Sequence, residues 1–294
     1  MKHIIIFLLS LGMTMAANAQ RFDPQRNTIT VVAPLGPGGP TDSAARVFSD
    51  FLSRKGYTSV TVNKPGGGGV VGTAYVAGRT GDNYTLVVLT KSSFYPPLIG
   101  TENLGYNENT LQPIGLVGSA LPALALGPLV KSTTLDQLVE EFKQNNLRLN
   151  WGTFGGLTEL YVNQLVAGTG VKPTVVLYRS SAALLTDVLS GTVQIGLLDL
   201  NNAKNLAESG KLRIISGPQI AANIGFWWGI YAAPGASREA VEWYSRMMME
   251  MHRDPEAQAV IGRVFNGSKN YSLTEFENFH AAEVAGIKRL ISSK

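Results

Sequence analysis

Short apolar and β-branched runs alternate along the chain with segments in which apolar residues recur at helical spacing. Residues 29–33 predict a buried strand, and the apolar positions within residues 44–52 predict the helix that follows it. Residues 60–63 and 84–90 predict two more strands, with a helix between them that ends near Gly78. This alternation is typical of βαβ units and predicts a mainly parallel sheet.

The same alternation begins again further along the chain and predicts a second sheet. Thr134 and Gln137 form a capping-box pattern, which predicts the start of a helix. Because a single sheet of this many strands would be large, two α/β lobes fit better than one. We expect lobe 1 to comprise residues 20–121 and 226–294, and lobe 2 to comprise residues 122–225. The further strands are predicted at residues 123–126, 147–152, 175–178, 193–198, 212–216 and 226–233.

Residues 1–19 have the layout of a secretory signal peptide. Lys2 gives a positive start, residues 4–11 are apolar, and Ala17-Asn18-Ala19 is a small-x-small cleavage site. The apolar core is too short for a membrane-spanning helix, which needs about 20 apolar residues. We therefore expect cleavage after Ala19 and a location in the periplasm. An uncleaved anchor or a buried first helix is the alternative.

Composition narrows the range of functions. Apolar residues make up 45% of the chain and charged residues 16%, which is typical of a globular protein. The formal net charge of +4 suits the attraction of small anions. The Lys and Arg residues are not clustered as nucleic-acid binding requires, and we expect no nucleic-acid partner.

The chain contains no cysteine, which excludes thiol catalysis and thiolate metal sites. Outside the predicted signal peptide the histidines are His252 and His280. Both fall in charged helical segments, where we expect them at the surface. No Gly-x-Ser-x-Gly motif is present. A Ser-His-Asp site or a His-rich metal site therefore has few possible residues, and we expect no enzyme activity, no cofactor and no metal.

Four junctions between a strand and the next helix are rich in glycine and hydroxyl residues. They are residues 36–42 (GPGGPTD), 63–69 (NKPGGGG), 151–158 (WGTFGGLT) and 178–182 (YRSSA). In open α/β sheets, ligands bind beyond the carboxyl ends of the strands, where helix N-termini offer unpaired N–H groups. Because glycine lets the backbone approach a ligand closely, each junction is a candidate site for an anion.

Each junction also has a purely structural interpretation. Residues 36–42 fit a tight turn with a helix cap, residues 63–69 fit a flexible loop, and Arg179 fits an exposed side chain beside a serine cap. Asp199 follows a predicted strand. It either orients an amine or hydroxyl of a ligand or caps the helix that starts near Asn201. The residues alone leave these alternatives open.

Six motifs follow one another in a recognisable order. Residues 34–42 are similar to a P-F-x-P-G-G-x-x-D pattern, and residues 63–72 to N-x-P-G-A-G-G-x-x-G. With these motifs the chain resembles the substrate-binding proteins of tripartite tricarboxylate transporters, the Bug family, along nearly its whole predicted mature length. The family's D-G-Y-T-L, Y-K-G-x-x-x-A-L-x-D-L-x-x-G, A-G-K-L-R and W-x-G-x-x-A-P-x-G patterns correspond to residues 82–86, 178–191, 209–213 and 227–235.

The resemblance implies a two-lobed periplasmic binding protein of type II-like fold, with a ligand cleft between the lobes. It implies capture of a small carboxylate there and its delivery to the membrane permease subunits of a tripartite transporter. Di- and tricarboxylates, amino acids and aromatic acids all fit this implication. A ligand-sensing subunit on the same fold and an exported hydrolase or transferase are the alternatives.

The expected ligand contacts come from four places in the chain, each at the end of a predicted strand. The resemblance implies ligand contacts from the first glycine loop, from the residues after the third strand and from two loops of lobe 2. In the third loop, Phe154 and Leu157 stand where the family has a serine and a glycine. With Asp199 added from its place after a strand, the expected residues are Gly38, Gly39, Pro40, Thr41, Asp42, Thr90, Ser92, Ser93, Thr153, Phe154, Gly155, Thr158, Tyr178, Ser180, Ser181 and Asp199.

Overall fold

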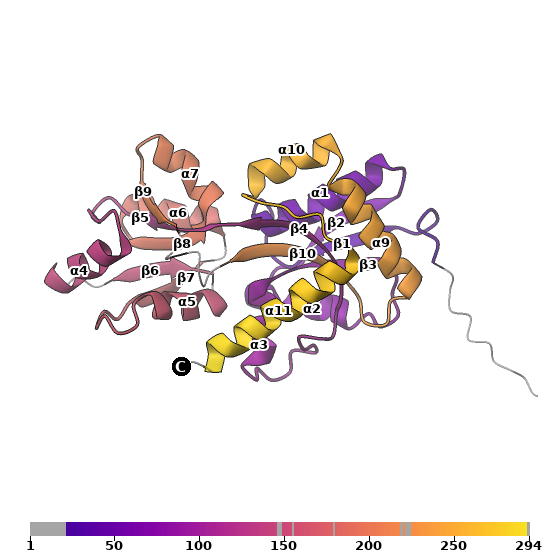
Figure 1. The fold of residues 1–294 in the computed structure, drawn as a ribbon, viewed down its shortest axis with the longest axis horizontal. Helices are drawn as coiled ribbons and strands as arrows, with labels where there is room; N and C mark the ends of the chain where they lie inside the picture. The colour runs from indigo at the N-terminus through magenta and orange to yellow at the C-terminus, as the bar shows by residue number, and fades with distance from the viewer. Residues whose placement is uncertain are drawn as a thin grey trace, which may run out of the picture.

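The computed structural model describes residues 22–145, 149–154, 156–178, 180–217, 220 and 225–292. In this part of the chain, two five-stranded sheets lie side by side along the long axis of the molecule, each with its own helices (Figure 1). We call the sheet that holds the first strands, with its helices, lobe 1, and the other sheet with its helices lobe 2. The predicted signal peptide lies outside the described residues.

The sheet of lobe 1 has the strand order β2-β1-β3-β10-β4. Its first three strands pair in parallel, whereas β10 runs antiparallel to both β3 and β4. The strands are β1 (Ile29–Ala33), β2 (Ser59–Asn63), β3 (Thr85–Thr90), β4 (Gln112–Ala120) and β10 (Phe226–Ala232).

The sheet of lobe 2 repeats this arrangement with the order β7-β6-β8-β5-β9. Here β6 is parallel to β7 and β8, and β5 is antiparallel to both β8 and β9. Each mixed sheet therefore contains one reversed strand, and that strand follows a crossing of the chain from the other lobe. The strands are β5 (Pro122–Leu126), β6 (Asn150–Thr153), β7 (Thr174–Leu177), β8 (Ile195–Asp199) and β9 (Arg213–Ser216).

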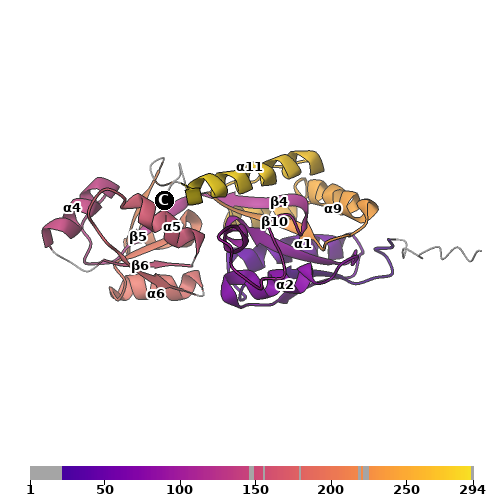
Figure 2. The ribbon, with the colours of Figure 1, turned by 90° about the horizontal axis from the view of Figure 1, so that it is seen from below.

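Helices cover both faces of the sheet in lobe 1. Here α1 and α9 pack on β4 and its neighbours, and α11 packs on β4 and extends towards lobe 2, where Figures 1 and 2 both show its end next to α5. The helices of lobe 1 are α1 (Pro40–Arg54), η1 (Gly67–Gly69), α2 (Val70–Ala77), η2 (Lys91–Phe94), α3 (Tyr95–Leu98), α9 (Arg238–Met251), α10 (Pro255–Val264) and α11 (Leu273–Ser292). Those of lobe 2 are α4 (Leu135–Asn145), α5 (Leu157–Leu165), α6 (Ser181–Ser190) and α7 (Leu200–Glu208).

The apolar core follows the alternation of strand side chains. Val31 of β1 packs in one cluster with residues of α1 and α9, whereas the adjacent Val32 packs in another cluster with Phe276 of α11. The second cluster continues into lobe 2, where it includes Trp151 and Tyr161. The two lobes are thus joined by packed apolar side chains as well as by the chain crossings.

The predicted strands agree with the structure to within a few residues, but β4 was not predicted. Its sequence, QPIGLVGSA, contains a proline and two glycines, which are unfavourable in a strand interior. The packing explains the glycines. A Cβ atom on Gly118 would lie 2.6 Å from the Phe265 ring, and one on Gly115 would lie 3.2 Å from Met248. Helix α10 was also not predicted.

The expectation that both histidines lie at the surface is wrong. The Nε2 atom of His252 lies 2.7 Å from the carbonyl oxygen of Leu116, and Nδ1 of buried His280 lies 3.1 Å from the Tyr231 hydroxyl. His252 at the C-terminal end of α9 contacts β4, and His280 of α11 contacts β10. His280 follows Phe276 by four residues, which puts both on the buried face of α11.

The predicted capping box is half present. The N–H of Gln137 donates to Oγ1 of Thr134 over 3.2 Å, but the Gln137 side chain accepts from Thr133 instead. Within the described residues, none of the helices is both long enough and apolar enough to span a bilayer.

Candidate functional site

Because neighbouring strands are parallel, the candidate loops lie together at the carboxyl ends of the strands in each sheet. The loops after β1 and β3 leave the same edge of the first sheet, because these strands are parallel neighbours. The loops after β6, β7 and β8 leave the same edge of the second sheet for the same reason. All the residues expected in the ligand site lie in these five strand ends or the helix starts that follow them.

Asp42 organises the first glycine loop. The N–H of Gly38 donates to its Oδ2 over 3.0 Å, Arg46 Nε donates to the same oxygen over 2.9 Å, and Asn63 Nδ2 donates to Oδ1 over 2.9 Å. Burial alone would raise the pKa of Asp42, but the three hydrogen bonds outweigh burial and lower the pKa below its ordinary value. The carboxylate therefore holds the loop against the end of β2.

The start of α1 has no side-chain cap. Gly39 is the N-cap residue, and Pro40 occupies the first turn. The Thr41 hydroxyl accepts the indole N–H of Trp228 over 3.0 Å, so it is engaged inside lobe 1. The loop offers a ligand the backbone N–H groups at the start of α1.

Thr90 and Ser93 cap each other at the exit of β3. Ser93 Oγ accepts from the N–H of Thr90 over 3.1 Å, and the Thr90 side chain accepts from the N–H of Ser93. The reciprocal bonds fix both side chains in the turn, while each hydroxyl keeps its own O–H for donation. Ser92 lies between them and is half-buried.

The third loop joins the end of β6 to the start of α5. Thr153 is fully buried, and its carbonyl accepts the N–H of Tyr178 over 2.8 Å. Gly156 is the N-cap of α5 at a φ of 42°, and no side-chain oxygen caps this helix. Thr158 is buried in the first turn and Phe154 is half-buried against the α6 side of the sheet. Gly155 lies outside the described residues.

The fourth loop is capped by its own side chains. Ser180 Oγ accepts from the N–H of Ala183 over 3.2 Å at the start of α6. The Tyr178 hydroxyl donates to Asp187 over 2.7 Å, and burial followed by this bond raises the pKa of Tyr178 to about 12. Arg179 lies outside the described residues.

Asp199 caps α7 and joins two of the loops. It accepts from the N–H of Asn202 over 3.2 Å and from the Asn202 side chain over 2.5 Å, and that side chain also donates to Ser181 Oγ over 3.3 Å. Burial raises the pKa of Asp199 above its ordinary value. The helix-cap alternative considered for Asp199 is therefore present in the structure.

The segment that follows β3 meets the third loop and α5 across the lobes. A Cβ atom on Gly156 would lie 2.9 Å from Cδ1 of Tyr95, so the Tyr95 ring of lobe 1 occupies the side-chain space of this glycine. Nearby, Nζ of Lys91 lies 5.9 Å from the centre of the Tyr161 ring of lobe 2. Lys91 directly follows β3 and Tyr95 begins α3, and neither was among the expected site residues. The hydrogen bond between Trp228 and Thr41 joins residues 187 positions apart, so no local sequence pattern indicates it.

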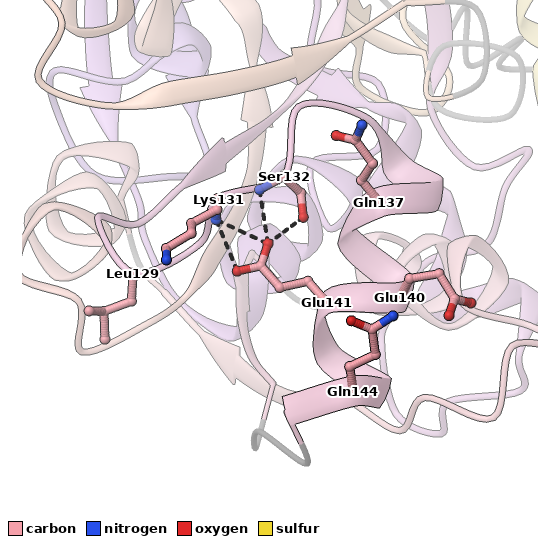
Figure 3. A pocket seen from close by; sticks show the side chains of 7 residues that line it. All are labelled: Leu129, Lys131, Ser132, Gln137, Glu140, Glu141 and Gln144. Carbon is pink, nitrogen blue, oxygen red and sulfur yellow. Dashed lines mark hydrogen bonds between the residues drawn. The ribbon is translucent and has the colours of Figure 1, made fainter.

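Two surface hollows among the described residues lie away from these loops. The larger, of about 540 Å³, lies beside α4 at the end of lobe 2 away from lobe 1. In Figure 3, the Glu141 carboxylate beside this hollow accepts from the N–H groups of Lys131 and Ser132 and from the Ser132 hydroxyl, which ties α4 to the segment before it. The smaller, of about 260 Å³, lies between Phe51 and Pro255. The described residues contain no acidic or histidine cluster that suits a metal.

Comparison with known proteins gives one family. The family described as tripartite tricarboxylate transporter family receptor matches residues 44–223. Protein BugT of Bordetella pertussis is 28% identical over 218 residues, which cover 72% of this chain and 66% of that protein. The matched part of the chain thus spans just under two thirds of the length of this relative.

Solved structures share the fold. One described as a periplasmic transporter superposes with a TM-score of 0.81 at 22% identity, over 90% of this chain and 96% of that chain. R. palustris Rpa4515 with adipate superposes with a TM-score of 0.77 at 23% identity, over 92% of this chain and 98% of that chain. The predicted fold class, two α/β lobes of a periplasmic binding protein, is confirmed.

Proposed function

We propose that this chain captures a small carboxylate between its lobes and delivers it to a membrane transporter. The basis is that the chain belongs to the family of tripartite tricarboxylate transporter receptors. The expectation that the chain is not an enzyme is confirmed by the family, since a receptor binds its ligand without converting it. The relative with bound adipate carries a carboxylate of this kind.

The observation that carries the proposal is a difference between helix starts. In lobe 2, α6 and α7 are capped by the side chains of Ser180 and Asp199. In contrast, α1 of lobe 1 and α5 of lobe 2 begin at Gly39 and Gly156, without a side-chain cap. Their first-turn N–H groups and the positive ends of their dipoles suit a carboxylate. A ligand bound to both helices also holds the lobes together.

Location and partners follow the same proposal. We assign the chain to the periplasm, with residues 1–19 as a cleaved leader, and the permease subunits of a tripartite transporter as its partners. The lobe bounds in the proposal are residues 20–121 with 226–294, and residues 122–225. Of the expected site residues, Gly38 and Asp42 support the loop, and the amides after Gly39 and Gly156 contact the ligand.

The test is thermal unfolding of residues 20–294 with a panel of small carboxylates. A ligand at about a thousandfold its Kd adds about 4 kcal/mol to the free energy of unfolding. For a chain of this size, the midpoint then rises by roughly 8–16 °C. A shift for one class of acids supports the proposal. The absence of any shift from a folded sample contradicts it.

A matched pair of variants tests the helix start itself. A Cβ atom on Gly39 meets nothing within 4 Å, and its φ of −94° suits any residue. In Gly39→Asp, the new carboxylate caps α1 and competes with the ligand for the same N–H groups. We expect Gly39→Asp to lower carboxylate affinity by about tenfold or more, while its thermal stability without ligand is kept or slightly raised. Gly39→Ala leaves the N–H groups open and keeps the affinity. Equal affinity of the two variants would contradict the proposed site.

A further inference from the structure

Lys91 occupies an unusual position between the lobes. It is the first residue after β3 and begins η2, which contacts α5 of lobe 2. Its side chain is only 16% exposed. Burial of an ammonium group is unfavourable unless the charge is paired, so the surroundings of Lys91 define what it can bind.

On the side of lobe 1, Lys91 faces a carboxylate. Its Nζ lies 3.3 Å from Oε2 of Glu283 in α11, and the same oxygen accepts the indole N–H of Trp227 over 2.8 Å. The Glu283 side chain is 24% exposed. The ion pair is therefore mostly shielded from solvent, and Glu283 is its more exposed member.

On the side of lobe 2, Lys91 lies beside the ring of Tyr161. Its Nζ lies 5.9 Å from the centre of the Tyr161 ring, and the buried Tyr161 hydroxyl has no hydrogen-bond partner in the part of the chain that the structure describes. Burial, followed by the charge of Glu283, raises the pKa of Tyr161, so this hydroxyl keeps its proton and can donate it. A buried donor without an acceptor is costly, and it calls for a ligand or a water molecule.

Two more groups of this kind lie on β6. The Thr153 hydroxyl and the Trp151 indole N–H are buried without a partner among the described residues. They are two positions apart and share one face of the strand, whereas the side-chain space of Gly152 between them is filled from the opposite face by Leu184 and Tyr178. Tyr161 belongs to α5, which packs on β6.

We propose that Lys91 is a specificity-determining residue, which selects ligands that carry a second anionic group. This inference rests on the proposed function, in which the first carboxylate binds at the starts of α1 and α5. The second carboxylate binds the Lys91 ammonium in exchange for Glu283 and accepts hydrogen bonds from the unpartnered donors of lobe 2. A carboxylate suits this set because it only accepts hydrogen bonds. Glu283 competes for Lys91 and thereby weakens the binding of every ligand that needs it.

Calorimetric titration of residues 20–294 with matched pairs of acids tests the inference. Succinate is compared with butyrate, and adipate with hexanoate, so that each pair differs in the second carboxylate. We expect the diacid to bind more tightly in each length that fits. Lys91→Met lowers diacid affinity by about tenfold or more and leaves the monoacid nearly unchanged, because only the diacid loses a charged partner. Lys91→Arg keeps the preference.

Two further variants separate charge selection from a structural role. Glu283→Gln removes the competing charge and still accepts from Trp227, so diacid affinity rises. Lys288→Met removes another lysine that pairs with lobe 1, at 2.8 Å from Glu108, and changes neither affinity. Equal losses for diacid and monoacid in Lys91→Met, or a diacid affinity that does not change, would overturn the inference alone. Failure of all acids to bind the unmodified protein would overturn the proposed function as well.

Discussion

Replacement of Asp42 by Asn tests whether one buried carboxylate holds the first glycine loop. The carboxylate is 5% exposed and accepts from Gly38, Asn63 and Arg46. Asparagine has nearly the same shape but only one accepting oxygen. If the new NH₂ group replaces Oδ1, it faces the NH₂ group of Asn63. If it replaces Oδ2, it faces the N–H of Gly38. Either orientation leaves a donor without its acceptor.

The magnitude follows from these contacts. A hydrogen bond to a charged group contributes about 1.5–3 kcal/mol, and a buried donor left without a partner costs about 1–3 kcal/mol. The Arg46 side chain is 49% exposed, so the loss of its ion pair adds little. We expect Asp42→Asn to lower the free energy of unfolding by about 2–4 kcal/mol. For a chain of this size, that corresponds to roughly 5–15 °C in Tm.

Urea unfolding followed by tryptophan fluorescence measures this change, with Asp50→Asn as the control. Asp50 is exposed on the same helix, and its replacement is expected to change stability by less than about 0.5 kcal/mol. The pH dependence gives a second check. Because the folded pKa of Asp42 lies below its ordinary value of 3.8, its contribution is present above that value and is lost as the pH falls through the folded pKa. The difference between the two proteins therefore shrinks in acid. A loss below about 1 kcal/mol at neutral pH would refute this account of the loop.

Two other predictions concern packing and protonation. In Gly152→Ala, the new Cβ atom lies 2.2 Å from Leu184, so we expect urea unfolding to show a free energy of unfolding lower by about 1–3 kcal/mol. The control Gly262→Ala lies at an open helix position and keeps or raises stability. Equal effects of the two variants would contradict the packing described for Gly152. Burial lowers the pKa of His280 below its ordinary value of 6.5, so its contribution is complete above pH 6.5 and is lost as the pH falls below that value. We expect the urea midpoint to fall between pH 7.5 and 5.5, and to fall less in His280→Gln; an equal fall in both proteins would show that His280 does not contribute.

Much of the fold could be predicted because its signals are local. The alternation of strand and helix patterns identified most of the strands. The glycine junctions at strand ends identified the loops that parallel pairing gathers at two sheet edges. The missed strand β4 shows the limit. Its glycines weaken the strand pattern, and only the packing of Met248 and Phe265 against them shows why they are there.

The candidate site was predictable only in part. The sequence identified the residues after the strands, but it could not tell which of their side chains are already engaged. Thr41 is bonded to Trp228, which is 187 positions away, and Tyr178 is bonded to Asp187. The bond to Trp228 turns the Thr41 side chain into lobe 1, so the first loop offers a ligand its backbone N–H groups.

By itself, the sequence determined that this chain forms two α/β lobes with glycine-rich strand ends and belongs to a receptor family, because periodicity and motif order are properties of neighbouring residues. Tertiary structure decided the rest. It reversed one strand in each sheet, where the chain crosses between the lobes, and it buried His280. It also brought Lys91, which follows β3, next to Glu283 of the last helix and Tyr161 of the other lobe. Such contacts join residues that are far apart in the chain, and no local pattern records them, because they arise only when packed elements exclude water from the groups between them.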